Sequence, residues 1–219
     1  ALAKDAKIVL FDEIFVNLDY KLREEMRIEF KELVDKLNIT TIFSSPDPED
    51  GLSLADKVAI VCEGKILQYD TRDVIYNSPV NVFTGAYFGY PEMNLINCTI
   101  AAQNSGLQII ADSFQLPLDK AFPGKKIPPG NYIFGLRPEH INISQTKPDA
   151  GIFFVGRMLL TEVIGSDTIV HIDLGKNTIQ SFMPGIYRDV TDKQLYACFN
   201  PGAIYLFEQD SSSFVTRGV

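Results

Sequence analysis

The sequence predicts two architectures in one chain, an α/β part followed by an all-β part. The first part has a short apolar run at residues 8–11, a segment at 20–37 with apolar residues at helical spacing, and a second β-like run at 40–44. A strand, a helix and a strand form one βαβ unit. After about residue 92, short β-like runs are separated by Gly, Pro, Asn and Asp. That texture predicts a small barrel or sandwich.

The bulk composition is that of a globular chain long enough for one or two domains. The 219 residues are 46% hydrophobic and 22% charged, with a formal net charge of -8. An acidic chain without a basic cluster argues against a nucleic-acid partner, because phosphate contacts need Lys and Arg. The three cysteines are widely spaced and odd in number, which favours a reducing cytosol over a disulfide framework. Since no apolar run approaches the ~20 residues of a membrane-spanning helix, any membrane role should be peripheral.

Local signals place the other elements of the first part. Asp19 is a suitable N-cap for the helix at 20–37, and Asp47 followed by Pro48 is typical of a helix start. The run at 8–11 is expected to be a strand buried on both faces. Two strands joined by a tight turn and then two short helices are expected further along, at 58–62, 65–69, 71–76 and 80–88.

The change of texture predicts a domain boundary between Gly89 and Asn94. We therefore divide the chain into an α/β domain at 1–91 and a β-rich domain at 92–219. The clearest strand candidates of the second domain are short apolar runs, at 109–111, 132–134, 152–155, 168–172 and 203–207.

Asp12 and Glu13 are the most informative residues of the sequence. Two acids directly after a buried strand need partners or solvent. They could simply begin a solvated loop. They could also form a magnesium–nucleotide site, because Mg²⁺ prefers carboxylate and water oxygens and a second carboxylate could activate a water molecule. Residue types alone leave both interpretations open.

Residues 10–19, with the sequence Leu-Phe-Asp-Glu-Ile-Phe-Val-Asn-Leu-Asp, resemble the Walker B segment and D-loop of ABC ATPases. The resemblance implies that Asp12 holds Mg²⁺ through water and that Glu13 is the general base. It also implies that Asn17 and Asp19 lie at the ATP site, facing the opposite subunit across the nucleotide. The expected fold is thus part of a P-loop NTPase-type ABC ATPase domain, followed by an OB-like barrel or sandwich of the TOBE type.

The resemblance continues along nearly the whole chain. Residues 75–83 are similar to the helical exit of importers of sugars and glycerol 3-phosphate, and 135–140 (Gly-Leu-Arg-Pro-Glu-His) to the hallmark of the TOBE region. Further segments that are similar to the family lie at 40–43, 54–61, 64–68, 165–167 and 199–201.

Several departures from the family pattern bear on activity. The chain has no G-x-x-x-x-G-K-[ST] loop to cradle phosphates, no Q-loop and no LSGGQ-like signature, so we expect it to be truncated and inactive by itself. Pro46 stands where the family carries its H-loop histidine, and we expect a functional loss there. Ile14 replaces the usual proline, which we attribute to drift. Neither His140, expected to pack, nor His171, expected to face solvent, is assigned to catalysis.

Two functions follow as hypotheses. In the first, the intact protein is an energy-coupling subunit of an importer for sugars or glycerol 3-phosphate. It would bind ATP and Mg²⁺ in a homodimer, or in a heterodimer with a paralogue, and act with transmembrane permease subunits at the inner face of the membrane. The alternative, motivated by Pro46, is a degenerate scaffold or regulatory subunit paired with an active paralogue. A sugar- or anion-sensing role for the β-rich domain has no polar cluster to support it.

Overall fold

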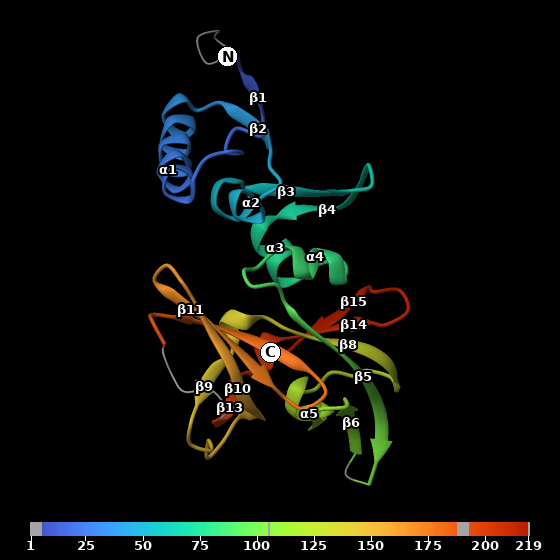
Figure 1. Cartoon of the computed structure of the whole chain (residues 1–219). Helices are drawn as coiled ribbons and strands as arrows, with labels where there is room; N and C mark the ends of the chain where they lie inside the picture. Colours follow the sequence, from blue (N-terminus) through green and yellow to red (C-terminus); the bar gives the residue numbers. More distant parts are fainter. Residues whose placement is uncertain (1–5, 105, 188–192, 219) are drawn as a thin grey trace. The chain divides into compact units, whose positions relative to one another are not determined.

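A computed structural model describes residues 6–104, 106–187 and 193–218 (Figure 1). The chain forms two compact units, Ala1–Ile75 and Tyr76–Val219, here called the N-terminal unit and the C-terminal unit. None of the described helices is long and apolar enough to cross a membrane.

The N-terminal unit begins with the predicted βαβ arrangement. Strand β1 (Ile8–Asp12) pairs in parallel with β2 (Thr40–Ser44), and helix α1 (Tyr20–Leu37) connects them. The Asp19 carboxylate accepts a hydrogen bond from the Leu22 amide, which confirms the predicted N-cap.

Only one face of this two-stranded sheet is covered within the described residues. Phe30 of α1 packs edge-on against Phe11, Phe15 and Phe43, with ring centroids 5.0, 5.7 and 6.2 Å away. On the opposite face Ile8, Leu10 and Ile42 are exposed, and Leu10 is 71% exposed. The prediction that 8–11 is buried on both faces is therefore wrong here, because nothing described packs on the second face.

Four further elements complete the N-terminal unit: α2 (Pro48–Leu54), β3 (Lys57–Cys62), β4 (Lys65–Thr71) and most of α3 (Arg72–Asn77). Asp47 caps α2 by accepting from the Glu49 amide, as predicted. The antiparallel β3 and β4 are joined by a turn at Glu63 and Gly64. Both turn residues have positive φ, as a tight hairpin of this kind requires.

The C-terminal unit is built from two antiparallel sheets. One has the strand order β12-β11-β10-β13-β9 and the other β15-β14-β8-β5-β6-β7. The strands of the first are β9 (Asn142–Ser144), β10 (Ile152–Ile164), β11 (Asp167–Asp173), β12 (Thr178–Pro184) and β13 (Gln194–Phe199). Those of the second are β5 (Asn94–Gln103), β6 (Gly106–Ile110), β7 (Gln115–Pro117), β8 (Gly130–Leu136), β14 (Ile204–Glu208) and β15 (Phe214–Arg217). The short helices are α4 (Val82–Tyr87), α5 (Leu118–Ala121) and the 3₁₀ turns Pro138–His140 and Pro201–Ala203.

The two sheets share one hydrophobic core. Phe134 of β8 lies 6.1 Å from Phe154 of β10, and Phe154 lies 4.8 Å from Phe199 of β13, measured between ring centroids. Ile100, Ile172 and many other apolar residues are buried in the same cluster. The predicted all-β domain is confirmed as two sheets around a common core.

A smaller apolar cluster lies on the β8 and β14 strands of the six-stranded sheet. It consists of Met93, Tyr205 and Phe207, with Val82 of α4 packed against it. Gly135 makes room for it, because a Cβ there would lie 2.7 Å from the Met93 sulfur. Residues before 92 are thus part of the C-terminal unit, and the compact units divide earlier than the sequence domains at 1–91 and 92–219. That sequence division stays a prediction.

Arg137, from the segment 135–140, is fully buried and connects β8 to the segments around Tyr76 and Phe88. Its guanidinium donates to the backbone carbonyls of Phe88 and Tyr76 and lies 4.0 Å from the centroid of the Tyr76 ring. The Tyr205 hydroxyl also donates to the Tyr76 carbonyl, at 3.2 Å. Tyr76 donates its own hydroxyl to Glu139, and burial together with that carboxylate raises the pKa of Tyr76 well above its usual value.

Candidate functional site: the carboxylates at the end of β1

Asp12 is the last residue of β1, and Ser44 is its partner in the parallel register. Alternation along the two strands places both side chains on the uncovered face of the sheet. The Ser44 hydroxyl donates to Oδ1 of Asp12 at 2.5 Å. Asp12 and Ser44 are both exposed, so the carboxylate stands at an open edge.

Glu13 follows Asp12 in an unusual backbone conformation. Its φ is 49°, a left-handed value that non-glycine residues adopt only at a cost. The Glu13 amide donates to both the hydroxyl and the carbonyl oxygen of Ser44, each at 3.1 Å. The Glu13 carbonyl accepts from the Val16 amide at 3.2 Å. The chain therefore turns sharply at Glu13, and the exposed side chain leaves the sheet beside Asp12.

Asn17 and Asp19 lie in the connection that leads into α1. Asn17 has φ 71°, a conformation that Asn tolerates better than most residues, and its side chain is exposed. The Asp19 carboxylate is occupied as the N-cap of α1. Buried Phe15 anchors this connection against Phe30. The roles of Asn17 and Asp19 at a nucleotide stay predictions.

Pro46 lies in the loop between β2 and α2. The Ser45 hydroxyl donates to the Asp50 carboxylate and accepts from the Asp47 amide at 3.0 Å, so Ser45 is engaged within the loop. Pro46 contributes no side-chain donor at this edge.

Both histidines lie in the C-terminal unit. His140 is partly buried, and burial lowers the pKa of its imidazole. The expected solvent-facing position of His171 is wrong: its side chain is 18% exposed, with Nε2 2.8 Å from the Glu162 carboxylate on neighbouring β10. The expected alternation is present, because Val170 and Ile172 on either side are fully buried, but the face of the sheet that carries His171 is itself partly covered.

An ion-pair network that no sequence motif marks joins α1 to α2. Buried Arg27 donates to Asp50 at 2.6 Å, to Glu49 at 3.0 Å and to Asp47 at 3.2 Å. Burial opposes its charge, but the hydrogen bonds to Asp50 and Glu49 outweigh burial and raise the pKa of the guanidinium above its usual value. Arg23, one helical turn earlier, reaches Asp47 at 2.5 Å. The spacing of the two arginines opposite an acidic helix start was the available signal.

The oxygen donors at the end of β1 suit a metal ion that is shared with a substrate. Among the described residues no group of three or more His, Cys, Asp and Glu side chains could hold a metal alone. Mg²⁺ is commonly held by one or two carboxylates together with water and substrate phosphates. Asp12 and Glu13 fit that mode of binding, whereas this sequence contains no glycine-rich phosphate loop.

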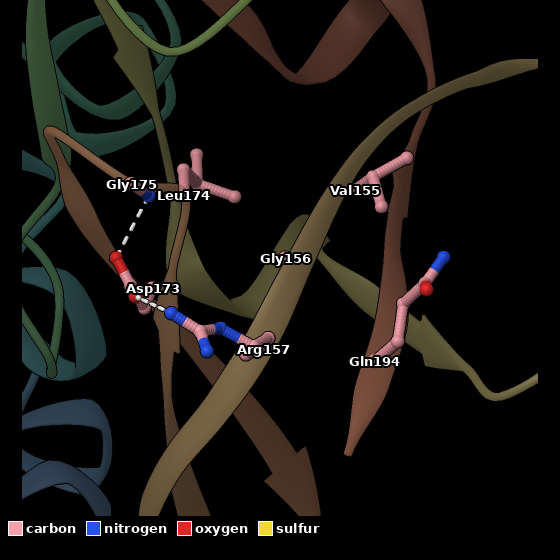
Figure 2. A pocket seen from close by; sticks show the side chains of 7 residues that line it. All are labelled: Val155, Gly156, Arg157, Asp173, Leu174, Gly175 and Gln194. Atoms are coloured by element: carbon pink, nitrogen blue, oxygen red, sulfur yellow. Dashed lines mark hydrogen bonds and ion pairs between the residues drawn. The ribbon is translucent and has the colours of Figure 1, made fainter. Parts of the chain in front are cut away.

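A shallow hollow of about 330 Å³ in the C-terminal unit is lined by residues of β10, β13 and the end of β11 (Figure 2). Arg157 pairs with Asp173 at 3.4 Å, and Asp173 also accepts from the Gly175 amide at 2.7 Å. The charged groups that line the hollow thus pair with one another, and the hollow is lined by none of the predicted site residues.

Comparison with known proteins bears directly on the predicted family. Residues 89–141 match the family model of the MalK OB fold domain. The sulfoquinovosyl glycerol transport ATP-binding protein SmoE of Agrobacterium fabrum is 31% identical over 95% of this chain and 57% of its own length. The sn-glycerol-3-phosphate import ATP-binding protein UgpC of Psychromonas ingrahamii is 34% identical over 78% of this chain and 43% of its own length.

The similarity to ATP-binding transport proteins extends over nearly all of the sequence. An uncharacterized ABC transporter ATP-binding protein, y4oS of Sinorhizobium fredii, is 30% identical over 97% of this chain and 55% of its own length. The chain thus spans about half the length of the relatives it matches. The predicted resemblance is confirmed, as is an OB-type domain, and the scaffold alternative is not favoured by relatives of this kind.

Proposed function

We propose that the complete protein is the ATP-binding, energy-coupling subunit of an ABC importer for sugars or glycerol 3-phosphate. One observation carries the proposal: a chain similar to such subunits over 95% of its length places an Asp-Glu pair at the carboxyl end of a parallel strand. That is the edge of an open α/β sheet where ligands bind.

Asp12 and Glu13 have distinct roles in this proposal. Asp12 holds Mg²⁺ through water, and Glu13 orients and deprotonates the water that attacks the γ-phosphate. The ion, when bound, neutralises charge on the phosphates. Asn17 and Asp19 lie on the connection that faces the opposite subunit. The triphosphate itself needs a phosphate-binding loop, which these 219 residues do not contain.

The partners follow from the same proposal. The ATP-binding subunit works as a pair, with a second copy or a paralogue, and drives transmembrane permease subunits from the cytoplasmic face of the membrane. The β-rich domain helps to hold the pair together.

Pro46 determines the rate of ATP hydrolysis that we expect. A preorganised donor at a developing charge contributes roughly 100–1,000-fold in rate, and Pro46 supplies none. Since the Ser45 hydroxyl is bonded within the loop, it is not placed to substitute. We therefore propose that a site containing Pro46 hydrolyses ATP slowly.

Single-turnover hydrolysis by the complete gene product tests these roles. Pro46→His should raise the rate at least about tenfold, and Glu13→Gln should abolish the raised rate while ATP still binds. Uptake of labelled sugars and glycerol 3-phosphate by a strain lacking the gene is the companion measurement. Uptake of every solute at the parental level would refute the transport role.

The 219-residue chain provides a separate check. Calorimetry with Mg-ATP should detect no tight binding, because the phosphates have no loop to receive them. A micromolar dissociation constant, which corresponds to a binding free energy of about -8 kcal/mol, would show that the chain does contain phosphate-binding elements.

A further inference from the structure

We propose that Ser44 is a positioning residue of the carboxylate pair, with one hydroxyl that orients the Asp12 side chain and fixes the Glu13 backbone. The inference rests on the proposed function, because it assigns a role within the same site. No motif of the sequence includes Ser44 among the expected site residues.

The geometry uses both hydrogen-bonding capacities of the hydroxyl. Ser44 Oγ donates its proton to Asp12 Oδ1 at 2.5 Å and accepts from the Glu13 amide at 3.1 Å. A hydrogen bond to an ionised carboxylate is stronger than one between neutral groups. A single atom therefore joins the side chain of the proposed metal residue to the backbone of the proposed base.

This contact has a consequence for each acid. With Oδ1 engaged, the Asp12 carboxylate is held in one rotamer, and Oδ2, which makes no hydrogen bond among the described residues, is left for a metal-bound water. The left-handed conformation of Glu13 costs free energy unless its surroundings hold it. The two bonds from its amide to Ser44 provide that support.

Ser44 is itself held at both ends. On one side it continues the parallel ladder of β2, directly opposite Asp12. On the other side, buried Arg27 of α1 donates to the carboxylate of Asp47 in the loop that follows Ser44, at 3.2 Å. Because the loop is anchored to α1 through Arg27, the Ser44 hydroxyl is preorganised instead of being recruited when a ligand arrives.

The test uses the 219-residue chain and Mn²⁺ alone as the probe. Even without substrate phosphates the two carboxylates should bind Mn²⁺ weakly, and the bound ion should broaden the NMR amide signals of Asp12 and Glu13. A titration gives the affinity. Ser44→Ala should weaken Mn²⁺ binding about tenfold, as losses of outer-shell hydrogen bonds commonly do. Ser44→Thr keeps a hydroxyl and should stay within about twofold of the unmodified chain.

Ser45→Ala is the matched control, since its hydroxyl serves the loop and does not contact Asp12. It should leave Mn²⁺ affinity within about twofold. Unchanged affinity in Ser44→Ala, an equal loss in Ser45→Ala, or no rescue by Ser44→Thr would each overturn the role of Ser44 alone. Absence of broadening at Asp12 and Glu13 in the unmodified chain would instead overturn the metal site, and the inference with it. Unchanged amide signals elsewhere in the spectrum verify that each variant is folded.

Discussion

The N-terminal unit and the C-terminal unit handle apolar strand residues in opposite ways. In the C-terminal unit two sheets close on one another, and Phe134, Phe154 and Ile172 are buried in a common core. In the N-terminal unit one helix covers one side of β1 and β2, and Leu10 and Ile42 on the other side are exposed. Local patterns are sufficient to form the strands in both units, whereas burial needs a second layer.

The proposed catalytic residues lie in the unit with the uncovered sheet. The uncovered face is the one on which Asp12 and Ser44 stand at the end of their strands. The proposed site thus borders apolar surface that is exposed in the described residues, whereas the closed C-terminal unit contains none of the proposed catalytic residues.

The largest difference should appear in limited proteolysis. Poorly covered strands open easily, so a protease should remove the N-terminal unit and leave a resistant C-terminal fragment. Because α4 packs against Phe207 and Met93, the fragment should begin near Tyr76 and retain α4. Mass spectrometry of the fragment locates its first residue. A start near residue 92 would favour the sequence boundary, and survival of the first 75 residues would reverse the comparison.

The next largest difference should appear in the free energy of unfolding of two single substitutions, one in each unit. Phe134→Ala removes a fully buried ring between the sheets and should lower the free energy of unfolding by about 3–5 kcal/mol. Leu10→Ser removes an exposed side chain and should change the free energy of unfolding by less than about 0.5 kcal/mol. Urea denaturation followed by circular dichroism measures both. A large loss in Leu10→Ser would mean that its face is covered in solution.

Cysteine alkylation tests the same contrast chemically. Burial raises the pKa of Cys98 in the core to about 12 and also raises the pKa of Cys198. Few thiolates are then available, so Cys98 should react at least about 100-fold more slowly than partly exposed Cys62 of the N-terminal unit. Timed labelling with iodoacetamide and peptide mass spectrometry gives the three rates. Equal rates for Cys62 and Cys98 would contradict a closed core.

The smallest expected effect concerns pH. Burial lowers the pKa of His140 below its usual value near 6.5; nearby Glu139 opposes the shift, while Arg217 and Arg137 add to it. Between the folded pKa and about pH 6.5, the unfolded chain binds the proton that folded His140 does not, so stability should fall as pH decreases through this window. Comparing urea midpoints at pH 7.5 and 5.5 with those of His140→Gln isolates the effect. An identical pH dependence in the variant would exclude it.

The sequence predicts the N-terminal elements well because their signals are local. Asp19 and Asp47 cap helices a few residues away, and the limits of α1 coincide with the expected 20–37. The position of Asp12 follows directly from the end of an apolar strand. Ser44 could not be predicted as readily, because its role depends on a parallel register between strands 32 residues apart.

Strands of the C-terminal unit were harder to predict. The apolar runs identify parts of β6, β8, β10, β11 and β14, but not β5, β7, β9, β12, β13 or β15. In β5, buried Ile96, Cys98 and Ile100 alternate with polar residues such as Asn97 and Thr99, so no continuous apolar run marks it. Its pairing with β8 joins residues thirty or more positions apart, which local propensity does not encode.

Arg137 has a consequence for how sequences of this kind can diverge. Two of its acceptors are main-chain carbonyls, at Tyr76 and Phe88, and every amino acid carries such a carbonyl. The side chain at 88 can therefore change without removing its acceptor, whereas residue 137 itself has little freedom. Lysine has three donors on a single nitrogen and lacks the planar fork that reaches separate carbonyls and lies against an aromatic ring. Selection at this junction should consequently act more strongly on the codon of Arg137 than on the codon of Phe88.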